Sequence, residues 1–201
     1  SSHEIKKESN PFTDRDWRML LYAWTGLAVR VAVIFAGAFS VYQFLVTTEE
    51  KRVERTFQLL ELWEKPEYQE AQLAVRQRIT DLQQRYPSQF GANPSQTELA
   101  VYMDRIGLAA MREDGGSMPL PEFKRNFDSL VYFLNRVATC VQANQCSRQV
   151  TDDYFRDLSV TFWNYFSKYA RQVRAAGSPT FSVPIEEYVT GRRPNVSNSL
   201  A

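Results

Sequence analysis

The longest apolar run in the chain covers residues 19–46, MLLYAWTGLAVRVAVIFAGAFSVYQFLV, and Arg30 is its one charged residue. About 20 mostly apolar residues suffice to cross the ~30 Å hydrocarbon core of a bilayer. At a helical rise of ~1.5 Å per residue this run would extend roughly 42 Å. The run therefore predicts one transmembrane helix, which we place at residues 17–47. Aromatic residues near both ends fit the membrane interfaces; they are Trp17, Tyr22, Trp24 and Tyr42.

Two other interpretations of the apolar run fit the sequence less well. A signal peptide has a shorter apolar region and a small-residue cleavage site, whereas this run is followed directly by TTEEKRVER, which starts at Thr47. A core helix of a soluble protein usually keeps one polar face, whereas residues 31–46 are apolar on all faces. We therefore expect an uncleaved membrane anchor, and the lipid bilayer is its first partner.

Arg30 is the unusual residue of the predicted span, because a charge near the bilayer centre costs at least ~2.5–3.5 kcal/mol on insertion scales. Its long side chain can reach the nearer interface, or it can pair with an acidic or carbonyl group on a partner helix. Four small residues at four-residue spacing form a ladder that lets another helix approach closely. We predict partner-helix contacts at Ala28, Arg30, Ala32, Ala36 and Ser40.

Beyond residue 47 the hydrophobic residues recur at helical spacing. In residues 47–64 this spacing gives one apolar face, so the membrane helix is expected to continue past the bilayer. Ser95 and Glu98 form a capping-box pattern at the start of one later helix. The further predicted helices cover residues 67–86, 96–112, 121–143 and 150–175.

These elements predict an all-α fold, in which one N-terminal transmembrane helix is followed by a soluble antiparallel bundle of about five helices. The bundle is expected to occupy residues 48–177. Residues 1–16 are polar and are predicted to be a flexible N-terminus. Residues 178–201 are predicted to be an irregular C-terminal tail, apart from a short turn at 184–189.

Charge does little to narrow the function. The chain has 24 Lys and Arg against 23 Asp and Glu, a formal net charge of +1, which gives no reason to expect a nucleic-acid partner. Lys and Arg near the span slightly favour a cytoplasmic N-terminus. The soluble domain would then lie outside the cytoplasm, in the periplasm if the chain sits in the inner membrane of a Gram-negative bacterium.

The residues that usually carry chemistry are scarce. The one histidine is His3, and a single terminal histidine provides neither a metal site, which needs several converging ligands, nor a Ser-His-Asp or Cys-His arrangement. No nucleotide-binding or nucleophile-elbow motif is present. The sequence predicts no catalytic residue, no metal and no cofactor, and hence a protein that is not an enzyme.

The two cysteines, Cys140 and Cys146, lie on either side of VQANQ. If the preceding helix ends near Ala143, the chain can fold back and bring the two sulfurs together. A disulfide across so short a loop would contribute only ~2 kcal/mol or somewhat more, and it would persist only in an oxidising compartment. Two free thiols in a cytosolic domain remain the alternative.

The chain also resembles a known family. Three segments show the resemblance: RTFQLLELWEKPEYQEAQLAV at 55–75, FDSLVYFLNRVATCVQANQCSRQVTDDYF at 127–155 and FWNYF at 162–166. Together with a short N-terminus and one membrane helix, they resemble the uncharacterised bacterial domain-of-unknown-function family 4760 over residues 40–190. The resemblance implies a membrane-anchored helical domain and brings no activity with it.

The sequence thus favours a non-catalytic, single-pass accessory or scaffold subunit of a larger integral membrane protein complex. The hypothesis rests on the small-residue ladder, on Arg30 and on the absence of chemistry. The alternative is a self-associating membrane-anchored sensor, or a ligand-binding helical domain, in which the ladder serves homodimerisation.

Overall fold

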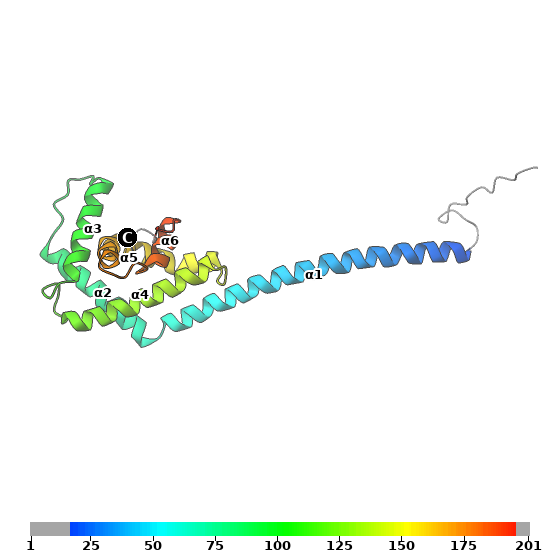
Figure 1. The fold of residues 1–201 in the computed structure, drawn as a ribbon, viewed down its shortest axis with the longest axis horizontal. Coiled ribbons are helices and arrows are strands. Elements are labelled where there is room, and N and C mark those ends of the chain that lie inside the picture. The colour runs from blue at the N-terminus through cyan, green and yellow to red at the C-terminus, as the bar shows by residue number, and fades with distance from the viewer. Residues whose placement is uncertain (1–16, 196–201) are drawn as a thin grey trace, which may run out of the picture. The chain divides into compact units, whose positions relative to one another are not determined.

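The computed structural model describes residues 17–195. Over that range the chain is helical and contains no strand (Figure 1), so the predicted all-α fold with one apolar N-terminal helix is confirmed. The predicted flexible N-terminus, 1–16, lies outside the described residues, as does the end of the tail from 196. The helices are α1 (Trp17–Trp63), α2 (Pro66–Arg85), α3 (Gln96–Ala110), α4 (Leu120–Gln142), α5 (Arg148–Ala175) and α6 (Val183–Thr190).

Helix α1 runs without interruption from Trp17 to Trp63, so the predicted span and the stripe that follows it belong to one helix. The segment contains no proline, and the next proline, Pro66, starts α2 in its first turn, where its missing N–H costs nothing. The chain divides into two compact units between Glu50 and Lys51. The first unit contains the apolar part of α1, and the second contains the end of α1 and all the other helices.

Local signals account for the starts of two helices. Ser95 accepts a hydrogen bond from the N–H of Glu98, and the Glu98 carboxylate accepts one from the N–H of Ser95, so the predicted capping box is present. Ser147 caps α5 by accepting from the N–H of Val150. This cap places the start of α5 at Arg148, two residues before the predicted start.

The core of the second unit is built around α4, whose apolar stripe is buried and packs against α2, α5 and α6. Phe127 lies among the rings of Phe162, Phe166 and Tyr169, with centroid distances of 5.6, 4.9 and 5.7 Å. In Figure 1, α4 lies across the view whereas α5 is seen nearly end-on. The two helices therefore cross, instead of running antiparallel as in the expected bundle. The residues of the stripe are Phe123, Phe127, Leu130, Leu134, Val137 and Val141.

Helices α3 and α5 pack closely because Gly107 has no side chain. A Cβ placed on Gly107 would lie 1.7 Å from the backbone oxygen of Tyr165. No side chain fits in that space, so the approach of α3 to α5 depends on this glycine.

The predicted irregular tail, 178–201, is wrong in its central part. Residues Val183–Thr190 form the helix α6, whose Ile185 and Tyr188 are 0% and 3% exposed and belong to the core. The apolar residues of FSVPIEEYV at 181–189 cover too short a stretch to show a helical period, so only a short turn was predicted at 184–189. Packing on α4 and α5 supplies the stability that an eight-residue helix lacks by itself.

Candidate functional site

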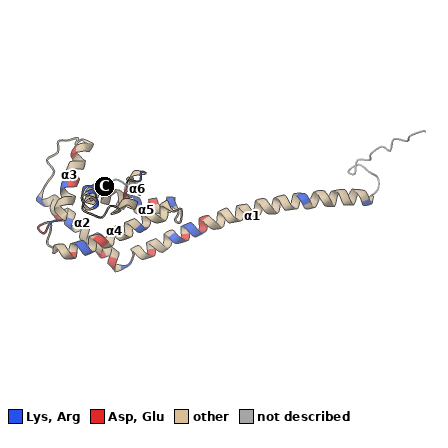
Figure 2. Ribbon diagram, viewed as in Figure 1, with Lys and Arg blue, Asp and Glu red and all other residues tan. Residues whose placement is uncertain are grey.

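The apolar part of α1 is exposed along its whole length. No residue of 17–46 is buried, and this is the segment of the described chain that is long and apolar enough to cross a membrane. Figure 2 shows it almost without charge, and the sequence assigns its charged residues as Arg18 and Arg30. The hydroxyl of Thr25 donates to the carbonyl of Leu21 within the same helix, which satisfies a polar group without water. This part of α1 is suited to a hydrocarbon environment.

The residues predicted to contact a partner helix all lie on this part of α1. Ala28, Arg30, Ala32, Ala36 and Ser40 are exposed, and a Cβ on neighbouring Gly26 or Gly37 would meet nothing within 4 Å. The four small residues share one face, as their four-residue spacing requires. Arg30 lies on a different face, about 160–200° around the helix axis from its neighbours Ala28 and Ala32.

The two cysteines, Cys140 and Cys146, are joined by a disulfide, with a Cα–Cα distance of 5.3 Å. The bond closes the turn between α4 and α5, and we call residues 140–147 the disulfide turn. Inside it, the N–H groups of Gln145 and Cys146 both donate to the carbonyl of Cys140, at 2.9 and 3.1 Å. Asn144 adopts the left-handed region with φ of 53°, a conformation that asparagine tolerates better than most residues. The covalent bond and the local hydrogen bonds thus define one compact turn.

The disulfide turn holds the end of α1. Ser147 N–H donates to Thr56 Oγ1 at 3.0 Å and to the carbonyl of Arg52 at 3.3 Å. In return, Arg52 Nε donates to the carbonyl of Asn144 at 2.9 Å. Thr56 is completely buried and Ser147 is 5% exposed, so the bond between them is shielded from water and an unpaired partner would be costly. The bond between Arg52 and Asn144 is exposed.

Aromatic packing holds the same end of α1 one to two turns further on. Leu59 is 6% exposed, and Trp63 lies 4.7 Å from Phe133 and 6.1 Å from Phe155, measured between ring centroids. Residues 51–63, which we call the docked segment, are therefore fixed by two sets of contacts. The sequence predicted the apolar set through helical spacing but gave no sign of the polar set, because Thr56 and Ser147 are 91 residues apart.

A buried arginine organises the connection between α3 and α4. Arg78 is 2% exposed, and its guanidinium donates to the carbonyls of Ala110, Met118 and Arg112 at 2.7, 2.8 and 2.6 Å. It also lies 4.4 Å from the ring centroid of Phe123. Burial lowers the pKa of Arg78, and the charge of Asp114 opposes that effect. The sequence contained a signal here, since Arg78 lies three residues after Val75 and four before Leu82, on the buried stripe of α2.

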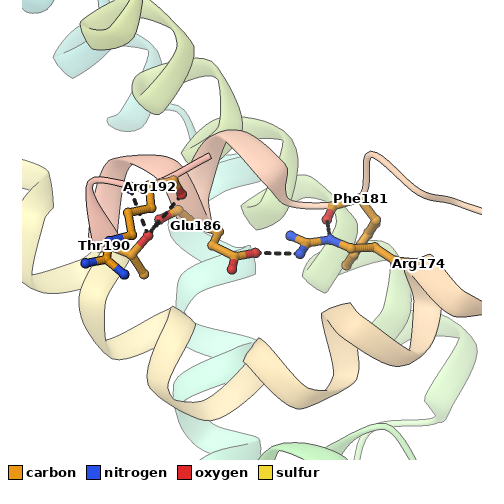
Figure 3. A network of polar contacts seen from close by, with 5 residues as sticks. All are labelled: Arg174, Phe181, Glu186, Thr190 and Arg192. Carbon is orange, nitrogen blue, oxygen red and sulfur yellow. Dashed lines mark hydrogen bonds and ion pairs between the residues drawn. The ribbon is translucent and has the colours of Figure 1, made fainter. Parts of the chain in front are cut away.

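Two arginines of α5 hold α6 and the segment before it. Arg174 forms an ion pair with Glu186 and donates to the carbonyl of Phe181 at 2.7 Å (Figure 3). Arg156 donates to the carbonyls of Tyr188 and Val189 at 3.0 and 3.2 Å. These contacts explain why the tail packs on the core, and none of them was predicted from the sequence.

Tyr188 adds a buried polar contact to this region. Its hydroxyl donates to the Asp152 carboxylate. Burial, and then the bond to Asp152, raise the pKa of Tyr188 well above its usual value. The hydroxyl therefore stays protonated and serves as a donor at neutral pH.

A groove of about 410 Å³ lies between α2 and α5, with α4 beneath it. Its floor is apolar and includes Ile79, Leu130 and Phe162, while Gln83 and Tyr165 are joined across it by a hydrogen bond of 2.7 Å. Cavities of this size accommodate small molecules. Within residues 17–195 no three His, Cys, Asp or Glu side chains lie close enough together to hold a metal ion.

Comparison with known protein families shows which family the chain belongs to. The model of the domain of unknown function DUF4760 matches residues 30–191, which is most of the chain. The chain belongs to the DUF4760 family. No curated protein and no solved structure matches. The DUF4760 match covers the docked segment, the disulfide turn, Arg78 and α6, and its first residue is Arg30 within the apolar part of α1.

Proposed function

We propose that this DUF4760 protein is a non-catalytic, single-pass membrane subunit that associates with a larger integral membrane protein complex and holds a helical domain at the bilayer. One observation carries the proposal: the apolar residues 17–46 of α1 are exposed on every side. A helix that is hydrophobic all round is buried in a large core or in a membrane. Nothing in the described part of the chain covers this one, so its apolar surface needs lipid or a partner.

The ladder and Arg30 support a protein partner in addition to lipid. Small residues at four-residue spacing allow close helix packing, which is the main source of helix association within a bilayer. An arginine at membrane depth is costly and commonly pairs with a group on another helix. Ala28, Ala32, Ala36 and Ser40 would form the contact face in this proposal, and Arg30 would meet an acidic or carbonyl group.

The disulfide supports a location of the helical domain outside the cytoplasm. Disulfides are rare in the reducing cytosol and persist in the periplasm or outside the cell. The same orientation follows weakly from the basic residues before the span. We place the chain in a bacterial inner membrane, with its domain in the periplasm.

Alkylation of intact cells tests this orientation. With the domain outside the cytoplasm, Cys140 and Cys146 should resist a membrane-impermeant maleimide. They should react fully once a membrane-impermeant reductant is added. Immediate modification without reductant would contradict the disulfide. Modification only after lysis would contradict the periplasmic orientation.

Affinity purification in mild detergent tests the association. The tagged full-length chain should co-purify with an integral membrane protein, and Ala32→Leu with Ala36→Leu should reduce the recovered partner at least ~10-fold by blocking close approach. Ala38→Leu is the matched control, because Ala38 lies about 200° around the helix from Ala36. A chain that runs alone as a monomer would refute the proposal.

Self-association of the same face is the competing outcome. In-membrane cross-linking separates the two possibilities, since adducts of the chain with itself support a homodimer and adducts with another protein support the accessory subunit. Homodimeric adducts that disappear in the Ala32→Leu, Ala36→Leu variant would replace the proposed complex by a self-associating anchor.

The groove between α2 and α5 favours a second candidate function, the binding of a small amphipathic molecule. Its apolar floor would hold an aliphatic or aromatic body, and Arg76 and Asp157 at its rim would contact polar ends. Native mass spectrometry of the full-length chain in nanodiscs should detect a co-purifying small molecule, which Ile79→Trp should displace by filling the groove. Identical spectra for the two proteins, without an adduct, would exclude this function.

A further inference from the structure

The disulfide turn contains the Cys140–Cys146 bond and contacts the end of α1. Its backbone provides three of the polar contacts that hold the docked segment: Ser147 N–H to Thr56 and to Arg52, and the Asn144 carbonyl to Arg52 Nε. Leu59 and Trp63 add apolar contacts, and the Trp63 carbonyl accepts a hydrogen bond from the Gln69 side chain at 2.6 Å. The contacts that Arg52 and Thr56 make with the disulfide turn depend on the conformation of that one turn.

We propose that the Cys140–Cys146 disulfide is a redox-sensitive lock, which keeps the docked segment of α1 on the helical domain and releases it upon reduction. The lock does not depend on the identity of a membrane partner. It assigns a role to the disulfide beyond stabilising the fold, namely control of the docked segment at the start of the domain.

The geometry gives the reason for the coupling. The disulfide brings Cys146 back to the end of α4, and the next residue, Ser147, carries the N–H that bonds to Thr56 and Arg52. Without the covalent bond, the turn is held by hydrogen bonds, such as the two to the Cys140 carbonyl and the one from the Asn144 N–H to the Val141 carbonyl. A single hydrogen bond adds little net stability, so the reduced turn opens more often and takes Ser147 away from Thr56.

The two sulfurs differ in access. Cys146 is 3% exposed, whereas Cys140 is half-buried and lines a groove together with Arg55, Leu59 and Arg136. A thiolate of a dithiol reductant would attack the Cys140 sulfur and break the S–S bond, and Cys146 would leave as a thiolate that takes up a proton. The second thiol of the reductant then displaces Cys140 as a thiol. The protein gains two electrons and two protons, and the dithiol becomes a disulfide.

Limited trypsin digestion of the full-length protein in nanodiscs tests the lock. Lys51, Arg52 and Arg55 are cleavage sites within the docked segment, and cleavage there releases the helical domain from the nanodisc. Proteolysis in a folded protein follows the population of the locally opened state. We expect release to be roughly 10-fold faster after treatment with dithiothreitol, with cleavage at Arg125, an exposed residue within α4, unchanged.

Two variants keep the result interpretable. The Cys140→Ser, Cys146→Ser protein should release its domain at the rate of the reduced protein, with or without dithiothreitol. Thr56→Val keeps the disulfide and removes the acceptor of the Ser147 N–H, so it should speed release in the oxidised protein. Arg148→Gln, next to the turn and outside these contacts, is the matched control and should leave the rate unchanged.

Two results would overturn the lock. Equal release rates for the oxidised and reduced proteins would show that the docked segment does not depend on the disulfide. A reduction-induced rise in cleavage at all sites together, with loss of helical circular dichroism, would show that the bond stabilises the whole domain and controls no local release.

Discussion

Apolar residues are abundant in both the first part of α1 and the helix α4, yet their environments in the two helices are opposite. Phe35 in α1 is 70% exposed, whereas Phe127 in α4 is 1% exposed. In α4 the apolar residues form a stripe, and charged residues such as Lys124 and Arg125 occupy the other face. In residues 31–46 of α1 no polar face exists. The way in which apolar residues are distributed around a helix, more than their number, therefore decides whether the rest of the chain can bury that helix.

An arginine in each of the two regions also has different surroundings. Arg78 lies in the core of the domain and has three carbonyl partners and an aromatic ring. Arg30 lies in the apolar part of α1 and is exposed. A buried cation needs partners from its surroundings, and the folded domain supplies them for Arg78. For Arg30 the partners would come from the interface or from another helix.

The largest expected effect comes from charging the apolar part of α1. Ile34→Asp with Val41→Asp should cost up to about 7 kcal/mol of insertion free energy, because a carboxylate at the centre of a span costs ~2.5–3.5 kcal/mol and one nearer its end costs less. The variant should fail to insert, and the membrane fraction after alkaline carbonate washing measures this. Leu73→Asp with Val101→Asp is the matched control, since both residues are exposed on the domain, and it should stay in the membrane. Full insertion of the first variant would contradict the comparison.

Truncating a phenylalanine in each region should separate the two environments. Phe127→Ala should lower the free energy of unfolding of the domain by about 3–5 kcal/mol, because it leaves a cavity among the four aromatic rings around it. Phe35→Ala should leave that free energy unchanged. Denaturant unfolding of the detergent-solubilised protein, followed by circular dichroism, compares them, and similar losses for the two variants would argue against separate environments.

The two arginines provide the next comparison. Arg78→Met should destabilise the domain by about 3 kcal/mol, since three carbonyls lose their buried donor. Arg30→Leu should leave domain stability as it is and, in our proposal, should weaken the recovery of the partner. The same unfolding measurement applies, and an unaffected Arg78→Met protein would show that water replaces the guanidinium.

The smallest of these effects is expected at two glycines. Gly107→Ala should cost about 2–3 kcal/mol by forcing α3 away from the Tyr165 backbone, whereas Gly26→Ala has open space around it and should be neutral. Thermal unfolding monitored at 222 nm would detect the difference. Equal melting temperatures would mean that α3 shifts without loss of packing.

Much of the fold could be predicted because its signals are local. The stripe of α4, the capping box at Ser95 and the apolar run of α1 each depend on residues within a few turns of one another. The start of α5 was misplaced by two residues because Ser147 was not recognised as a cap. The crossing of α4 and α5 depends on side-chain fit between helices, which periodicity does not record.

Contacts between distant residues could not be predicted. The bond between Thr56 and Ser147, the pairing of Arg174 with Glu186 and the burial of Tyr188 in α6 all depend on how separate helices meet. The cysteines were singled out by their spacing, whereas their connection to Arg52 and Thr56 required the structure. The predicted partner contacts on α1 stay a prediction, because the described chain contains no partner.

Extraction of the unaltered protein from native membranes tests the central claim most directly. Residues 19–46, lying in hydrocarbon, should keep the full-length chain in the pellet after washes with high salt, alkaline carbonate and urea, and detergent should release it. Recovery of the chain in the aqueous fraction after cell lysis, as a folded protein, would contradict the account.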